Sequence, residues 1–248
     1  MVVTNHSEQP YNLTRSLGFN AYQVLASDST DRLQACVGYL NEKYNTHFLI
    51  GLLEETASLI GAKVLNVSSE KYEPLGTSVA LLLADGGHPE HSQQLGTNTL
   101  LGHLDKSHLT VHTYPQLHLD TGLCSLRLDL DLATCGEISP LKTLPLLFTN
   151  ISCDVVTIDF RIRGYQRSGA GDLDFGSNEV VSIADYLPKI SQEQYQIKET
   201  NIPEILLYHT RMMRRNILPV NHILPSDEPM ELPSMANVEK HLKLLYRG

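Results

Sequence analysis

The stretch Gly122-Leu-Cys-Ser-Leu-Arg-Leu-Asp-Leu-Asp-Leu132 decides how this chain folds. From Leu126 to Leu132, leucines alternate with arginine or aspartate, so that every second side chain is apolar. Because successive side chains of a β-strand point to opposite faces of its sheet, the pattern predicts a strand with one buried and one polar face. We therefore expect a sheet that is packed on one side.

Further strands are expected before and after this stretch, because short runs rich in β-branched and aromatic residues are bounded by turn residues. They cover Phe19–Ser27, Lys63–Ser68, Thr77–Ala84, His108–Tyr114 and Val155–Tyr165. Several of these strands are joined by short links, which favours antiparallel pairing, since parallel strands need a long crossover.

Apolar residues at helical spacing lie between the strands and after them. The expected helices are one from Ser29 to Tyr44, one from Phe48 to Ile60 that ends at Gly61, one from Ser139 to Asn150, and two near Ile205–Arg214 and Val238–Tyr246. Polar segments at Gly86–Thr99 and Ser168–Gly171 are expected to be a loop and a turn. The expected fold is an α/β two-layer sandwich, a mainly antiparallel sheet covered by helices on one face, in a single domain over 1–248.

Composition narrows the class of protein. The 248 residues are 42% hydrophobic and carry a formal net charge of −9, which disfavours a surface for nucleic acid or an anionic membrane. The polar N-terminus lacks a signal-peptide pattern and the apolar windows are short or interrupted, so we expect a cytoplasmic protein. Without an export signal, the four cysteines are expected to be free thiols.

The stretch that carries chemistry is Gly102-His-Leu-Asp-Lys-Ser-His-Leu-Thr-Val-His-Thr-Tyr-Pro115. Unaided, it predicts a loop followed by a strand, and its serine and histidines have ordinary structural explanations. The Gly-x-Ser-x-Gly pattern of many serine hydrolases is absent from the chain. The residue types alone therefore do not establish a catalytic site.

The run from His103 to Pro115, followed by Thr134-Cys-Gly136 and by Pro140, resembles the bacterial S-adenosylmethionine decarboxylases. The resemblance is greatest to their longer, enterobacterial-type subclass, and it thins over 86–99 and after Leu218. It extends to Leu13–Leu17, Ile60–Asn66, Tyr72–Pro74, Val156–Gly164 and His209–Arg211.

This resemblance implies that the chain cuts itself between Lys106 and Ser107, giving fragments 1–106 and 107–248. Ser107 would attack the carbonyl of Lys106 and become a pyruvoyl group, the covalent cofactor. His112 is implied as the base in processing, with Ser78 as a helper. An amide-to-ester shift is unfavourable for a relaxed planar peptide, so local strain or oxyanion stabilisation is expected.

The resemblance also implies how S-adenosylmethionine would be decarboxylated. The pyruvoyl ketone would form a Schiff base with the substrate amine, an electron sink for the pair released with CO2. Cys135 is implied as the donor that protonates the product, and Tyr72 as the ring that stacks on adenine. Gln116 is a departure, because the family usually has glutamate there, and an amide carries no charge.

The spacing of two of these residues raises a geometrical question. In an ideal strand, Ser107 and His112 are five positions apart and point to opposite faces. They can act together only if the junction bulges or turns, or if Ser107 lies in a bend before the strand.

The expected function is decarboxylation of S-adenosylmethionine for spermidine and polyamine biosynthesis. The alternatives are a pyruvoyl-dependent arginine or ornithine decarboxylase, which Gln116 keeps open, and an uncleaved, non-catalytic homologue. The family implies a homo-oligomer of two-fragment protomers, and magnesium stimulates some members. We expect no metal site, because the eleven histidines are scattered. The aspartates 129, 131, 154 and 159 are expected to be solvated.

Overall fold

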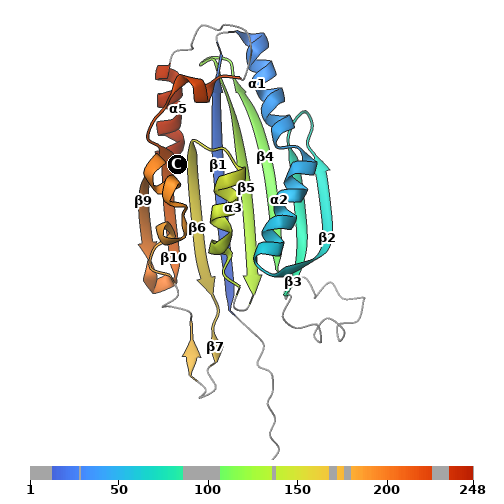
Figure 1. The fold of residues 1–248 in the computed structure, drawn as a ribbon, viewed down its shortest axis with the longest axis vertical. Helices are drawn as coiled ribbons and strands as arrows, with labels where there is room; N and C mark the ends of the chain where they lie inside the picture. The colour runs from blue at the N-terminus through green and yellow to red at the C-terminus, as the bar shows by residue number, and fades with distance from the viewer. Residues whose placement is uncertain are drawn as a thin grey trace, which may run out of the picture.

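The computed structural model describes residues 13–27, 29–85, 107–135, 138–167, 172–175, 180–224 and 235–247. Its centre is an eight-stranded sheet in the order β2-β3-β4-β5-β1-β6-β10-β9, and all neighbouring strands in it are antiparallel (Figure 1). The strands are β1 Thr14–Ala26, β2 Ala62–Lys71, β3 Thr77–Asp85, β4 His108–His118, β5 Leu123–Cys135, β6 Val155–Arg163, β9 Tyr195–Ile202 and β10 Leu207–Arg214. A separate pair joins β7 Gln166–Arg167 to β8 Leu173–Asp174.

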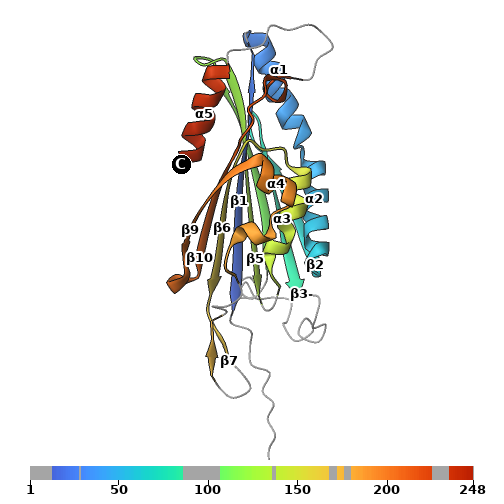
Figure 2. The same cartoon turned by 60° about the vertical axis from the view of Figure 1, so that its left-hand side comes forward.

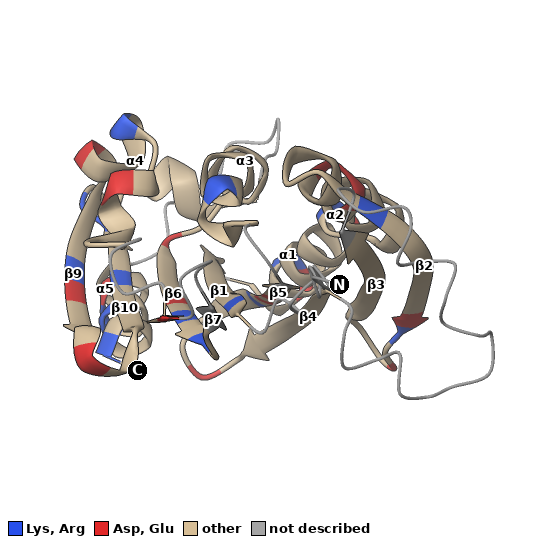
Figure 3. Cartoon of the chain, turned by 90° about the horizontal axis from the view of Figure 1, so that it is seen from below, with Lys and Arg blue, Asp and Glu red and all other residues tan. Residues whose placement is uncertain are grey.

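Four of the five helices that the structure describes cover one side of this sheet, as Figures 2 and 3 show from the side and from below. We call that side the helix face and the opposite side the outer face. The helices are α1 Thr30–Lys43, α2 Thr46–Leu59, α3 Leu144–Asn150, α4 Lys189–Gln194 and α5 Met235–Arg247. Between the sheet and α1–α4 lies the main apolar core, which includes Phe19, Leu53, Val111 and Leu128.

The alternation in 126–132 is confirmed. Leu126, Leu128, Leu130 and Leu132 are 0–2% exposed on the helix face, whereas Arg127 and Asp131 are exposed on the outer face. Both predicted helices form: α1 lies within one residue of the predicted ends, whereas α2 begins at Thr46, two residues before the predicted Phe48. Ser29 caps α1 by accepting a hydrogen bond from the Arg32 N–H, and Gly61 follows α2 with a φ of 73°.

The helix predicted over Ser139–Asn150 forms in two pieces. A 3₁₀ turn occupies Pro140–Thr143, and α3 begins at Leu144. Pro145 lies at the start of α3, where its missing N–H is tolerated. The predicted strand 155–165 ends at Arg163.

The prediction of a helix near Ile205–Arg214 is wrong, because residues 207–214 form strand β10, which lies between β6 and β9. Its burial alternates, with Tyr208, Thr210 and Met212 buried on the helix face. Backbone pairing with β6 and β9 satisfies its N–H and C=O groups. The predicted segments Gly86–Thr99 and Ser168–Gly171 lie outside the described residues.

The two-layer antiparallel fold class is confirmed, with one addition. Helix α5 lies on the outer face, at one end of the sheet (Figure 2). There Val238 and Leu242 pack against Val24 and Val155 in a second, smaller apolar cluster. On β4, β5 and β6 the rest of the outer face carries mostly polar side chains, as the alternation predicts.

Charged residues of both signs are interspersed along the strands and helices in Figure 3. Within the described ranges, no helix combines the length and apolarity needed to span a membrane.

Candidate active site

Ser107 lies directly before β4 and is 5% exposed. Its carbonyl oxygen accepts a hydrogen bond of 2.7 Å from the Leu83 N–H, which fixes its backbone against β3. By the alternation of the strand, Ser107 falls on the helix face together with Leu109 and Val111, both 0% exposed. Lys106 lies outside the described residues.

His112 lies on the outer face, so β4 separates it from Ser107. The strand pairs without a register shift with both β3 and β5. Five positions of regular strand span about 16 Å. The bulge that would bring the two side chains together is therefore not found in β4, and within one chain they lie on opposite faces.

Two strand neighbours lie directly beside His112 on the outer face. In the register of the sheet, Ser78 of β3 is its partner on one side and Asp129 of β5 on the other. The Tyr72 hydroxyl lies 2.8 Å from His112 Nδ1. The predicted residues Tyr72, Ser78 and His112 thus lie close together, although Tyr72 and His112 are 40 residues apart in sequence.

The rings of Tyr72 and His112 lie edge to edge. Their centroids are 6.4 Å apart and their planes differ by only 6°. Tyr114 is nearly parallel to both, with centroids 6.2 Å from Tyr72 and 6.4 Å from His112. The hydroxyl edge of Tyr72 is therefore engaged by His112, and this contact does not use the flat faces of its ring.

A tight turn holds Tyr72 in place. The Tyr72 N–H donates to the Gly76 carbonyl at 2.9 Å, and the Gly76 N–H donates to Asn41 Oδ1 of α1 at 3.0 Å. Gly76 has a φ of 106°, and a Cβ there would lie 2.5 Å from the Thr113 carbonyl oxygen. Only glycine fits this turn, which docks directly on β4.

Asp129 and Arg127 complete the surroundings of His112, and sequence reasoning missed them. Arg127 Nη2 lies 2.8 Å from Asp129 Oδ2, and its guanidinium carbon lies 4.5 Å from the Tyr114 ring centroid. Asp129 Oδ1 is buried and has no hydrogen-bond partner among the described residues. Burial raises the pKa of the Asp129 carboxyl, against the opposing effects of Arg127 and His112.

Asp154 also departs from the prediction of solvated aspartates. It is 4% exposed and its Oδ2 accepts a 2.9 Å hydrogen bond from the Val24 N–H. Burial raises its pKa as well. In contrast, the Asp159 side chain is 47% exposed and bonds His209 Nδ1 at 2.7 Å.

The remaining predicted residues lie apart from His112. Cys135 is the last residue of β5 and its backbone pairs with Thr14, but its side chain lies outside the described part of the structure. Gln116 is exposed on β4, four positions beyond His112. The other three cysteines, Cys36, Cys124 and Cys153, are free and buried, as predicted.

Thr134 anchors the chain beside Cys135. It is 0% exposed, and its hydroxyl lies 2.8 Å from the Ile138 carbonyl oxygen and 3.4 Å from that of Arg15. This contact ties the segment after β5 back to the end of the sheet at which Ser107 lies. That end is where β5 stops and β4 starts.

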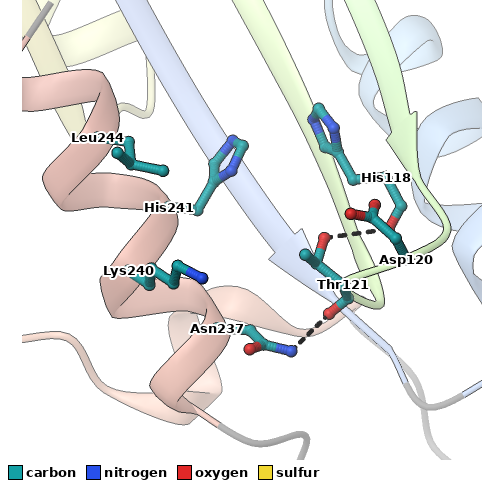
Figure 4. A pocket seen from close by; sticks show the side chains of 7 residues that line it. All are labelled: His118, Asp120, Thr121, Asn237, Lys240, His241 and Leu244. Atoms are coloured by element: carbon teal, nitrogen blue, oxygen red, sulfur yellow. Dashed lines mark hydrogen bonds between the residues drawn. The ribbon is translucent and has the colours of Figure 1, made fainter.

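A pocket of about 270 Å³ lies at the opposite end of the sheet, between α5 and the β4–β5 hairpin (Figure 4). His118 and His241 face it, with ring centroids 4.8 Å apart. Eleven strand positions separate His118 from Ser107, a distance of about 35 Å. The pocket therefore does not belong to the surroundings of Ser107. In the described residues, no three His, Cys, Asp or Glu side chains form a group able to hold a metal ion.

A family model described as S-adenosylmethionine decarboxylase matches residues 42–164, which span the Tyr72 turn, β4 and β5. An S-adenosylmethionine decarboxylase proenzyme of Chromohalobacter salexigens is 40% identical over 222 residues, covering 87% of this chain and 84% of the relative. The chain belongs to the S-adenosylmethionine decarboxylase family.

A second member of that name, from Alkalilimnicola ehrlichii, is 38% identical over 241 residues, covering 94% of this chain and 88% of its own length. The solved adenosylmethionine decarboxylase of Aquifex aeolicus matches with a TM-score of 0.32 and 17% identity, over 61% of this chain and 89% of that one. So low a TM-score adds nothing to the description of the fold.

The membership in the S-adenosylmethionine decarboxylase family predicted from the His103–Pro115 run is thus confirmed. In this family member, Ser107 lies directly before β4 and His112 lies within it, and their side chains fall on opposite faces of the sheet. One feature of the sequence pointed to Asp129 and Arg127, namely their position in the alternating strand that follows the motif. The pattern gives the face on which they lie, but not the neighbouring strand residue.

Proposed function

We propose that this chain is a self-processing S-adenosylmethionine decarboxylase, which cuts itself between Lys106 and Ser107 and uses the pyruvoyl group formed from Ser107. The proposal is carried by 40% identity to a proenzyme of that name over 84% of its length. The site is consistent with it, since a buried hydroxyl residue stands at the start of the strand that carries His112.

Self-cleavage uses the hydroxyl of Ser107. Its oxygen attacks the carbonyl carbon of Lys106, and an ester replaces the amide. Removal of the Ser107 α-proton then expels the Lys106 carboxylate, and hydrolysis of the resulting enamine releases ammonia. The hydrogen bond from Leu83 holds the backbone of Ser107 still during these steps.

His112 is the proposed base for this α-proton, with Ser78 beside it as a helper. Since about 16 Å of regular strand separates Ser107 from His112 in one chain, we propose that they meet between two copies in a homo-oligomer. Chains with Ser107→Ala mixed with chains with His112→Ala should then restore cleavage of the latter. If the mixture stays uncut, the start of β4 must rearrange within a single chain.

Decarboxylation draws on three further residues. Once formed, the pyruvoyl group supplies an electron sink for the pair released with CO2. Cys135 is the proposed donor that protonates the product carbon, and a thiol suits that role. Tyr72 would offer a flat face to adenine, and Gln116 would accept one hydrogen bond from a ribose hydroxyl. We further propose that the enzyme works in the cytoplasm and serves polyamine synthesis.

A decarboxylation assay tests this function directly. The processed protein should release CO2 from S-adenosylmethionine labelled at its carboxyl group, and not from arginine or ornithine. The same assay with and without Mg²⁺ tests metal stimulation. Release from a basic amino acid instead would assign Gln116 and its surroundings to a different substrate.

A further inference from the structure

We propose that Asp129 is a positioning residue for His112, because its carboxylate stabilises the positively charged imidazole that forms when His112 takes up a proton. The proposal rests on the role given above to His112. It adds a residue that the resemblance to the family did not suggest.

The register of the sheet carries the first step of the argument. Asp129 on β5 and His112 on β4 are directly opposite each other, and both point to the outer face. Opposite residues of an antiparallel pair have Cβ atoms about 5 Å apart. At that separation, a carboxylate and an imidazolium attract each other noticeably if water is partly excluded.

The environment of Asp129 limits its contact with water and leaves one oxygen for this role. The side chain is only 21% exposed, and Oδ2 is held by Arg127 at 2.8 Å. Oδ1 is buried and has no hydrogen-bond partner among the described residues. Since a buried acceptor without a partner is costly, a role outside folding stability is the better explanation for it.

Arg127 limits how the carboxylate can move. Its guanidinium is itself fixed over the Tyr114 ring at 4.5 Å, and Tyr114 is the strand partner of Arg127. His112 and Tyr114 on β4 and Arg127 and Asp129 on β5 are therefore four neighbours in mutual contact on the outer face. Tyr72 holds the other side of the His112 ring through Nδ1.

The charged and titratable groups that face His112 come from each neighbouring element. Tyr72 comes from the turn before β3, Tyr114 from β4 itself, and Arg127 and Asp129 from β5. Asp129 is the carboxylate directly opposite His112, and Asp131 lies two positions further along β5 on the same face. Removal of Asp129 should therefore change the pH dependence of any step in which His112 takes up a proton.

The test uses Asp129→Asn in the full chain, produced uncut by cell-free synthesis, with self-cleavage followed over time from pH 5 to pH 9. Asparagine keeps the shape and the acceptor for Arg127 but removes the charge. We expect cleavage about tenfold slower on the plateau, with the pH of half-maximal rate lower by about half a unit to one unit.

Two matched variants serve as controls. Asp131→Asn removes an exposed carboxylate from the same face of the same strand and should cleave within about twofold of the wild type. Asp129→Glu keeps the charge and should retain the wild-type pH profile. The melting temperature of Asp129→Asn, measured in an uncut Ser107→Ala background, should be unchanged or higher.

Three results would overturn the proposal: an unchanged rate and pH profile in Asp129→Asn, slower cleavage with a lower melting temperature and no pH shift, or equal effects in Asp131→Asn. A separate result would contradict the role of His112 itself, namely wild-type cleavage in His112→Ala. Failure of this inference and failure of the proposed function can therefore be told apart.

Discussion

Two aspartates, Asp129 within β5 and Asp154 directly before β6, each lie beside an arginine and a histidine, yet their surroundings differ. Asp154 is almost fully buried, with Arg214 3.5 Å from Oδ1, and with the Val24 N–H on Oδ2 and His222 3.8 Å from it. Asp129 has Arg127 on Oδ2 alone.

The difference separates a residue that holds the fold from one that is available for chemistry. Both oxygens of Asp154 face partners, His222 is 0% exposed, and Arg214 also donates to the Cys153 carbonyl at 3.0 Å. Asp129 lies beside the half-buried His112 and keeps an open acceptor. The partners of the two carboxylate oxygens, rather than residue type, distinguish the two aspartates.

The largest effect is expected at His112. His112→Ala should slow self-cleavage by about 10²–10⁴-fold, the usual contribution of a general base. Its melting temperature in the uncut Ser107→Ala background should change little, because the ring is only half-buried. Time-resolved gels of freshly made chain measure the rate. His209→Ala, which removes a histidine from β10 on the same outer face, is the matched control, and equal slowing there would undo the comparison.

At Asp154 the expected effect is on stability. Asp154→Ala should lower the free energy of unfolding by about 3–5 kcal/mol, because it leaves the Val24 N–H without its acceptor and removes the carboxylate beside the partly buried Arg214 and the buried His222. Urea denaturation in the uncut background measures it. The exposed pair of Asp159 and His209 supplies the control, since Asp159→Ala should cost less than about 1 kcal/mol. Similar losses in both would show that burial does not decide the effect.

The smallest effect is the pH dependence of stability at Asp129. Burial raises the pKa of this carboxyl in the folded chain, so the folded state favours its protonated form. Stability should then fall as pH rises from the ordinary aspartate value of about 3.9 through the raised value. Asp129→Asn should match the wild type at low pH and gain about 1–2 °C in melting temperature above that window. A gain that shrinks as pH rises would contradict the sign of this pKa shift.

The sequence predicted the strands well where one face is apolar, because alternation such as Leu126–Leu132 leaves little ambiguity. It failed at 207–214, where Tyr208, Thr210 and Met212 make a weaker apolar stripe and helical spacing fits nearly as well. The pairing of β10 with β6, about 50 residues earlier in the chain, overrides the local pattern.

Some residues of the candidate site could also be predicted from the sequence, whereas their contacts could not. Ser107 and His112 could be named from the motif, and their opposite faces followed from strand geometry. Asp129 and Arg127 could be assigned to a face but not to a neighbour, because the register of β4 against β5 depends on the length of the turn at 119–122. The contact of Tyr72 with His112 depends on the Gly76 turn, which no local pattern specifies.

An intact-mass spectrum of the freshly purified chain, beside its Ser107→Ala variant, tests the central claim most directly. The account predicts two wild-type fragments, Met1–Lys106 and a piece from 107 to Gly248 that is lighter than its serine form by one ammonia. The variant should remain whole. A wild-type chain that stays as one uncut species over days would contradict the claim of a self-processing decarboxylase.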